Sequence, residues 1–140
     1  VPHLRGEPGA MQGGPRYDDA VDEIRGYLDR QATRLVQAGV DARRIAVDPG
    51  IGFGKSYEHN REILCRLPEF TELGYPLLVG VSRKRFIGEA TGVEAPRDRL
   101  GGSVAAAVWA VAHGADIVRV HDVGDTVQAL RVTRAIQEER

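Results

Sequence analysis

Apolar residues recur along most of the chain at helical spacing, three or four positions apart. Between positions 17 and 38 this spacing, with Asp18 and Asp19 in the first turn and Gly39 just beyond the end, predicts an amphipathic helix. Its buried face is expected to consist of Val21, Ile24, Leu28, Ala32, Leu35 and Val36. Similar spacing predicts helices over 58–73, 84–90, 98–113 and 126–137, and the buried residues of 98–113 are expected to be Leu100, Val104, Ala107, Val108 and Val111.

Short runs of consecutive apolar residues lie between the helices, at 45–47, 76–81 and 117–120. Such runs predict strands that are covered on both faces. A glycine ends the helix before each run, at positions 39, 74 and 114. The alternation predicts parallel βαβ units, arranged either as a (β/α) barrel or as a doubly wound sheet. Residues 1–6 have the character of the end of a further strand, so we expect part of a longer protein.

The composition is that of one globular domain. The 140 residues are 42% hydrophobic and 28% charged, and the net charge of -1 provides no basic surface for nucleic acid or a membrane. With no apolar run of about 18 residues and no leader, we expect a soluble cytoplasmic protein. The single cysteine, Cys65, lies next to Leu64 and is expected to be a buried thiol in a reducing compartment.

The most informative stretch is Asp-Pro-Gly-Ile-Gly-Phe-Gly-Lys at 48–55, directly after the predicted strand 45–47. Alternating glycines let the backbone approach a ligand closely, which favours a binding site. The Asp48 carboxylate can accept two parallel N–H bonds from a heterocycle edge such as a 2-aminopyrimidinone. Asp-Pro-Gly is equally a good turn sequence, in which Asp48 caps its own turn. Phe53 would either stack on a planar ligand or anchor the loop.

Basic residues gather where the next two strands end. Ser-Arg-Lys-Arg at 82–85 begins a helix directly after a strand, so free N–H groups and cations meet there, which favours an anion site over a solvated helix start. Arg119 and His121 lie two positions apart on a strand, and a guanidinium beside an imidazole suits phosphate or pyrophosphate. The alternative is that Arg119 pairs with Asp116 or Asp122 and that His121 is structural.

Because the carboxyl ends of parallel strands meet at one edge, these polar strand ends are expected to form a single ligand-binding rim. The rim would comprise 3–5, Asp48, 82–84 and 119–122. His59, Trp109 and His113 lie on predicted helices and are expected to pack or to lie on the surface. The sequence has no zinc-binding spacing, P-loop or nucleophile elbow.

Three ordered motifs resemble bacterial dihydropteroate synthases. They are the stretch 48–55 followed by His-Asn at 59–60, Leu-Val-Gly-Val-Ser-Arg-Lys at 78–84, and Arg-Val-His-Asp-Val at 119–123. The likeness runs from His3 to about Arg134. That family has the α/β class and the (β/α)8 TIM-barrel fold, at roughly twice this length. The resemblance implies that residues 1–140 are a pterin-binding domain, the C-terminal half of the barrel, covering about the last four βα units.

The resemblance also implies an activity, the condensation of 7,8-dihydropterin-methyl pyrophosphate with p-aminobenzoate to give 7,8-dihydropteroate and pyrophosphate in folate biosynthesis. By motif, it assigns the pterin to Leu4, Asp48, Gly80 and Lys84, pyrophosphate to Arg119 and His121, and p-aminobenzoate to Phe53, Ser82 and Arg83. None of these residues is a nucleophile. Mg²⁺ is expected to assist the leaving group, with its ligands in an N-terminal half that this chain lacks. A homodimer is the expected assembly.

Two other functions stay open. One is a pterin-binding methyltransferase domain that uses methyltetrahydrofolate, although the basic residues at 82–84 and 119–121 argue against it because a methyl donor carries no pyrophosphate. The other is a non-catalytic half-barrel that serves as an assembly surface. Four parallel strands alone would expose two sheet edges, so the isolated chain is expected to be inactive.

Overall fold

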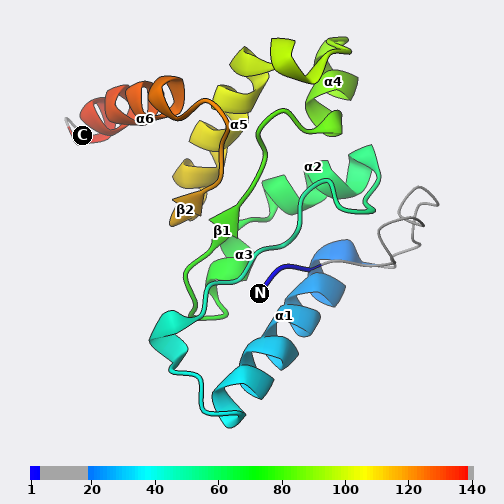
Figure 1. Cartoon of the computed structure of the whole chain (residues 1–140), viewed down its shortest axis with the longest axis vertical. Helices are drawn as coiled ribbons and strands as arrows, with labels where there is room; N and C mark the ends of the chain where they lie inside the picture. The colour runs from blue at the N-terminus through cyan, green and yellow to red at the C-terminus, as the bar shows by residue number, and fades with distance from the viewer. Residues whose placement is uncertain (4–18, 139–140) are drawn as a thin grey trace.

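Helices surround a few short extended segments in the structure, a computed structural model that describes residues 1–3 and 19–138 (Figure 1). The α-helices are α1 (Ala20–Gln37), α2 (Tyr57–Cys65), α3 (Pro68–Thr71), α4 (Arg85–Thr91), α5 (Leu100–Ala112) and α6 (Val123–Glu138). Two 3-10 turns cover Ala42–Arg44 and Pro96–Asp98, and the strands are β1 (Leu78–Val79) and β2 (Ile117–Val118).

The extended segments pair side by side in the order in which they occur along the chain. Pro2 forms a parallel bridge with Asp48, Val47 forms one with Leu77, and β1 pairs in parallel with β2. The strand order of a doubly wound sheet reverses at its switch point, whereas neighbours in a barrel follow the chain. The observed order therefore favours the barrel of the two predicted arrangements.

The strands are shorter than the apolar runs that predicted them. Each strand covers two residues, and the run 45–47 forms only single bridges. The pairing of β1 with β2 reaches the hydrogen bond from Arg119 N–H to the Val79 carbonyl, at 3.0 Å. It ends there because the next acceptor, the Val81 carbonyl, receives the N–H of Lys84 in a tight turn at 3.3 Å.

Most helices occur where the apolar spacing predicts them, but the single helix over 58–73 is wrong. Two helices, α2 and α3, occupy this stretch, and Pro68 begins the second. Proline has no N–H to continue a helix but suits its first position. The glycine ends are confirmed, since φ is 93° at Gly39, 74° at Gly74 and 100° at Gly114.

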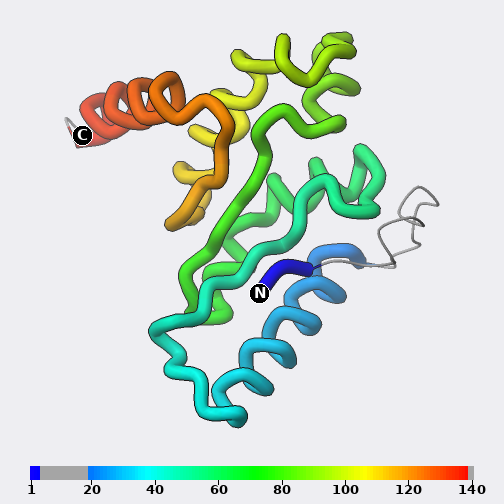
Figure 2. Tube along the Cα trace, viewed as in Figure 1, coloured from blue at the N-terminus to red at the C-terminus, as the bar shows by residue number. Residues whose placement is uncertain are grey.

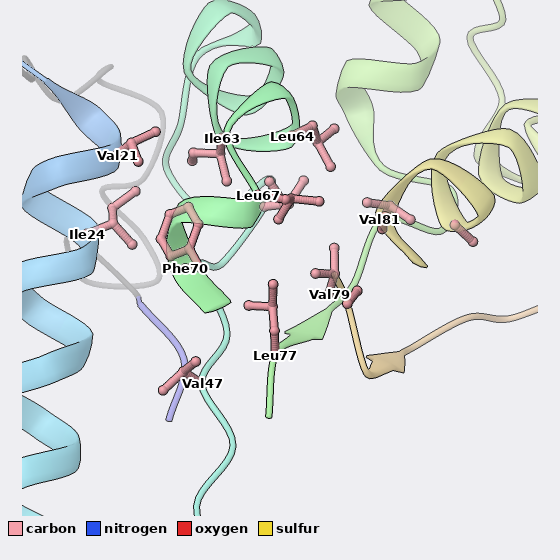
Figure 3. Close-up of a cluster of buried hydrophobic side chains, with 14 of the residues drawn as sticks. Val21, Ile24, Val47, Ile63, Leu64, Leu67, Phe70, Leu77, Val79 and Val81 are labelled. Carbon is pink, nitrogen blue, oxygen red and sulfur yellow. The ribbon is translucent and has the colours of Figure 1, made fainter. Parts of the chain in front are cut away.

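The hydrophobic core lies between the helices and the strands, and Figure 3 shows the side chains that meet there. Its largest members come from α1, α2, α3, the strand segments and the loops that connect them: Ile24, Leu28, Val47, Ile51, Ile63, Leu67, Phe70, Leu77, Val79 and Val81. Four residues of the predicted α1 face are buried, but Leu35 and Val36 near its end are exposed.

The predicted buried face of α5 is largely wrong. Of its five residues Ala107 is buried, whereas Leu100 and Val111 are exposed. The helix instead turns small residues inward, and a side-chain carbon at Gly102 would collide with Ile87 of α4. The close approach of α4 and α5 therefore favours small residues at their contact, and Leu100, Trp109 and Val111 are exposed.

Two predictions of burial are corrected. Cys65 is exposed, because the end of α2 turns Ile63 and Leu64 inward and leaves the thiol on the other side. Ile117 is 44% exposed, so β2 is not covered on both faces.

Figures 1 and 2 show α6 beside α5 and far from α1. Within the described ranges, no helix has the length and apolar character needed to cross a membrane.

Candidate functional site

The glycine loop after the segment 45–47 has the conformation that its sequence predicts. Gly50, Gly52 and Gly54 all have positive φ, at 71°, 84° and 64°. A side-chain carbon at Gly50 would collide with the carbonyl oxygen of His3, and one at Gly52 would lie 2.9 Å from Cδ of Lys84. The loop therefore passes closely over two neighbouring strand ends; the backbone of His3 leaves no space for a side chain at position 50, and the positive φ favours glycine at both positions.

Two residues that the sequence reasoning left without a role hold this loop. Lys55 donates from Nζ to the carbonyl of Gly50 at 2.7 Å. The buried Asn60 of α2 accepts the N–H of Gly52 at 2.7 Å and donates to the Ser56 carbonyl at 2.8 Å. The sequence offered one signal for Asn60: it is a polar residue at a helix position expected to face inward.

The loop lysine has an unusual titration. Burial lowers the pKa of Lys55 to about 8, the Asp48 carboxylate opposes this shift, and the charge of Lys84 adds to it. Its two hydrogen bonds go to loop carbonyls, those of Gly50 and Phe53.

Of the two roles that the sequence left open for Asp48, the structure shows the turn-capping one and leaves space for the other. Its Oδ1 accepts the N–H of Gly50 at 2.8 Å, so it does cap its own turn. A carboxylate can accept about four hydrogen bonds, and this one is only partly buried, so capacity remains for a ligand. The turn fixes the carboxylate at the end of the strand segment.

Lys84 reaches across from the turn after β1 to the glycine loop. Its Nζ lies 4.5 Å from the centroid of the Phe53 ring and donates to the carbonyl of Ile51. Desolvation lowers the pKa of Lys84 to about 8, with the Asp48 carboxylate opposing the shift and the Arg119 guanidinium adding to it.

Two adjoining cavities share the side chain of Arg119. One of about 290 Å³ is lined by Gly80, Ser82, Lys84, Arg119, Val120 and His121. The other, of about 530 Å³, is lined by Val1, Pro2, Arg44, Ala46, Asp48, Phe53, Leu78 and Arg119. A side chain at Gly80 would lie 3.3 Å from the Arg119 guanidinium, so the small residue leaves room for this group. The polar residues at the described strand ends therefore lie together, as the parallel arrangement predicts.

The two acidic partners suggested for Arg119 are engaged elsewhere. Asp122 forms a bidentate ion pair with Arg83, with Nη2 2.6 Å from Oδ1 and Nε 3.2 Å from Oδ2. Asp116 accepts the N–H of Leu77 at 2.9 Å. Arg119 is thus exposed to the cavities rather than neutralised by either acid.

Ser82 and Arg83 have partners within the protein. The hydroxyl of the buried Ser82 is hydrogen-bonded to His121 at both its backbone N–H (3.2 Å) and Nδ1 (2.9 Å). The Arg83 N–H donates to Ser103 Oγ at 2.8 Å, and the Arg83 carbonyl accepts from Arg99 at 3.0 Å. Sequence reasoning missed Arg99, Ser103 and the role of Asp122, since nothing in their spacing connects them with this turn.

The remaining candidate positions lie apart from the rim or outside the described residues. Trp109 of α5 and His113, which caps this helix, stack on each other with ring centroids 3.9 Å apart, so both have the packing or surface role that was expected. Leu4 and Arg5 lie outside the described residues. Among positions 1–3 and 19–138, no three His, Cys, Asp or Glu side chains gather closely enough to hold a metal ion.

Comparison with known proteins gives one consistent family. The pterin binding enzyme family matches residues 1–121. The dihydropteroate synthase of Escherichia coli (strain K12) is 48% identical over 133 residues, which are 95% of this chain and 47% of that protein. That of Neisseria meningitidis serogroup C is 50% identical over 135 residues, 96% of this chain and 48% of that protein.

Solved structures agree. Dihydropteroate synthase from Stenotrophomonas maltophilia, with active site-bound imidazole, has a TM-score of 0.95 and 47% identity over 98% of this chain and 52% of its own. The enzyme from Xanthomonas albilineans in complex with 7,8-dihydropteroate has a TM-score of 0.90 and 46% identity over 97% of this chain and 49% of its own. The chain spans about half the length of the curated relatives it matches. On these likenesses, together with the match over residues 1–121, the chain belongs to the pterin binding enzyme family.

Proposed function

We propose that this chain carries part of the active site of a dihydropteroate synthase, a transferase of folate biosynthesis. In the reaction, the C–O bond between the pterin methylene and pyrophosphate breaks, and both electrons leave with the pyrophosphate oxygen. The amine nitrogen of p-aminobenzoate then donates its lone pair to the methylene carbon and loses a proton. The leaving group must be stabilised as its negative charge grows, and no nucleophilic residue is needed.

One observation carries this proposal: Arg119 borders both the cavity that contains Asp48 and Phe53 and the cavity that contains Lys84 and His121. An acceptor for a heterocycle edge therefore lies next to a cluster of cations. A pterin joined to a pyrophosphate matches this arrangement, because it has a heterocycle with N–H donors at one end and an anionic group at the other. A methyl donor without pyrophosphate would leave the cationic part without a use.

For the pterin, Asp48 would accept the N–H groups of the aminopyrimidinone edge, and Lys84 would donate to its carbonyl and ring nitrogen. Both side chains are partly buried. Hydrogen bonds from them to a ligand would therefore be stronger than the same bonds in water. Gly80 would lie against the ring, where a larger residue would meet Arg119 and Lys84. Leu4 stays a prediction of the resemblance.

For pyrophosphate, Arg119 would supply a planar pair of donors and His121 a further one. Both line the smaller cavity beside Lys84, so three basic side chains face the place where charge develops. Mg²⁺, which the resemblance implies, would neutralise the leaving group when bound. The described residues offer no cluster that fits a metal ion, so none of them is assigned to hold it.

For p-aminobenzoate, Phe53 is the residue whose position supports the proposal best, since its ring lies on the glycine loop next to Lys84. The side chains of Ser82 and Arg83 are bonded to His121 and Asp122. Because these two side chains are engaged, the turn would contact the substrate through other atoms beside Lys84.

The ligands in solved structures of similar proteins support the same substrates. Solved dihydropteroate synthases similar to this chain are described with 7,8-dihydropteroate, with 4-aminobenzoic acid and with 6HMPPP. We propose that residues 1–140 form about the last four βα units of the (β/α)8 barrel of such an enzyme, which the sequential parallel order of the strand segments supports.

The experiment uses the assembled protein, meaning this chain joined to the N-terminal residues that complete the barrel. Binding of 7,8-dihydropterin-methyl pyrophosphate is measured by calorimetry, and dihydropteroate formation by chromatography. Asp48→Asn should weaken pterin binding at least tenfold, on the order expected for a charged hydrogen bond. Asp29→Asn, an exposed change on α1, is the matched control. Unchanged binding in Asp48→Asn would leave the carboxylate only its turn-capping role, and methyl transfer without dihydropteroate formation would favour the methyltransferase.

For the assembly, we propose a homodimer, as the resemblance implies, and we place its interface on α5 and α6. These helices carry large exposed apolar side chains, including Trp109 (46% exposed), Val123 (59%) and Ile136 (63%). A second copy would cover them. Light scattering should give a dimer that Ile136→Glu converts to a monomer, while Leu35→Glu on α1 leaves it intact. A dimer that survives Ile136→Glu would contradict this interface.

A further inference from the structure

The hydrogen bonds of Ser82 join the end of one strand segment to the next. In a regular parallel ladder, the N–H of His121 would bond to the carbonyl of Val81, two residues beyond the bond from Arg119 to Val79. In this structure the Val81 carbonyl instead accepts the N–H of Lys84, in the turn at the end of β1. The Ser82 hydroxyl accepts the N–H of His121, at 3.2 Å. A side chain thus extends the pairing of the two strands to the rim.

The same hydroxyl also contacts the imidazole, since Ser82 Oγ lies 2.9 Å from Nδ1 of His121. Ser82 is 6% exposed, so its hydroxyl hydrogen needs an acceptor inside the protein. The lone pair of Nδ1 provides one. With Nδ1 accepting, the neutral imidazole carries its proton on Nε2, the ring nitrogen left for a ligand.

The turn that carries Ser82 is itself fixed. Arg83 has a φ of 58°, in the left-handed region that is unfavourable for a residue with a side chain. Contacts from Arg99 and Ser103 hold its backbone, and its guanidinium pairs bidentately with Asp122, the residue after His121. The two turns are therefore connected on both sides of the Ser82–His121 contact.

We propose that Ser82 is a positioning residue, which orients His121 and keeps the proton on Nε2 so that the imidazole donates to an oxygen of a bound pyrophosphate. The proposal rests on the proposed function only for the identity of the anion. It assigns the Ser82 side chain a role through His121, not contact with p-aminobenzoate. An acceptor nitrogen facing the oxygens would repel them, so the tautomer matters for binding.

The test reads the tautomer directly, by ¹⁵N NMR of the histidine rings in the assembled protein without ligand. His121→Gln identifies the signal of His121. The wild type should show a protonated Nε2 and an accepting Nδ1, Ser82→Ala should show a mixture of tautomers, and Ser82→Thr should restore the wild-type pattern. A wild-type protein with the proton on Nδ1 would overturn the proposal even if Ser82→Ala did not fold.

Binding of inorganic pyrophosphate, followed by calorimetry at pH 8, provides the second measurement. Ser82→Ala should weaken it about tenfold, as loss of one hydrogen bond to a charged group does, and Ser82→Thr should restore it. Pyrophosphate affinity within twofold of the wild type in Ser82→Ala, with an unchanged tautomer, would overturn the proposal. A wild type that has the expected tautomer and binds no pyrophosphate would support the positioning role while refuting the proposed function.

Discussion

The Nζ atom of Lys84 lies 4.5 Å from the centroid of the Phe53 ring, so a cation from the turn after β1 contacts the aromatic residue of the glycine loop. Such a contact contributes about 0.5–1 kcal/mol where it is partly exposed. It also brings the residue proposed for the pterin next to the residue proposed for p-aminobenzoate. The two substrates must meet for the transfer, and this contact holds their candidate binding residues together.

The first prediction concerns the pH dependence of pterin binding. Because burial lowers the pKa of Lys84 to about 8, Lys84 loses its charge as the pH rises through that value. Affinity for 7,8-dihydropterin should therefore fall about tenfold between pH 7 and pH 9.5, the loss expected for one charge-assisted hydrogen bond. Fluorescence titration of the assembled protein at several pH values measures this fall.

Lys84→Arg tests the assignment, because a guanidinium stays charged across the range. Its affinity should vary little with pH, apart from the titration of the pterin itself, which is common to both proteins. An unchanged midpoint near pH 8 in this variant would show that another group, with Lys55 first among the candidates, controls binding.

The second prediction separates the backbone cost of a glycine from its contact with Lys84. Gly52 and Gly74 have φ of 84° and 74°, so alanine at either site should destabilise the protein by about 1–2 kcal/mol. Only at Gly52 would the new carbon meet a side chain, 2.9 Å from Cδ of Lys84, whereas nothing lies within 4 Å at Gly74. Gly52→Ala should weaken pterin binding and Gly74→Ala should not.

Urea unfolding gives the two stabilities, and calorimetry gives the two pterin affinities. Equal affinities in both variants would mean that the Lys84 side chain moves aside without loss of function.

The sequence predicted the rim because strand ends of a parallel fold meet by topology alone. Asp48, Lys84 and Arg119 could be grouped from the ends of their apolar runs, before any coordinates. Other contacts around these groups join residues 20 or more positions apart, as in the hydrogen bond from the Arg83 N–H to Ser103 Oγ. No periodicity encodes such contacts, so the hydrogen bonds between Ser82 and His121 could not be predicted from the sequence.

The prediction of which α5 residues are buried was wrong for a related reason. Hydrophobicity ranks Leu100 and Val111 as core residues, but the distance between α5 and α4 selects residues by size. The space available at a helix contact is a property of two elements together. The same limit applies to Cys65, whose neighbours in sequence are buried while it is exposed.

The third prediction concerns stability against pH. Burial lowers the pKa of Lys55 to about 8 from an ordinary value of 10.5. Between these values the unfolded chain binds more protons than the folded one, so the free energy of unfolding should rise with pH from about 8 to 10.5 on account of this group. Below pH 8 both states are protonated, and the full cost of burying the charge is present.

Lys55→Met removes the titration, so its stability relative to the wild type should decline as the pH rises from 8 to 10. Urea unfolding of the assembled protein at pH 7.5, 9 and 10 measures the two curves. Parallel curves would mean that Lys55 titrates alike in the folded and unfolded states. Lys84→Met is the companion variant, since Lys84 has a similar pKa shift and donates to a different loop carbonyl, that of Ile51.

The last prediction separates strain from ion pairing at Arg83. Glycine accepts a φ of 58° freely, whereas alanine pays for it, and neither can pair with Asp122. Arg83→Gly should therefore melt several degrees above Arg83→Ala, while both variants bind pyrophosphate more weakly than the wild type and to the same extent. Scanning calorimetry measures the melting temperatures, and titration calorimetry measures the affinities.

Arg83→Lys is the control, since it keeps the charge but has no planar fork for a bidentate contact. It should fall between the wild type and the glycine variant in pyrophosphate affinity. If Arg83→Gly bound pyrophosphate like the wild type, the ion pair with Asp122 would have no part in holding His121, and the left-handed turn alone would suffice. If Arg83→Gly and Arg83→Ala melted together, the backbone at Arg83 would relax on substitution, and its φ would depend on the guanidinium contacts.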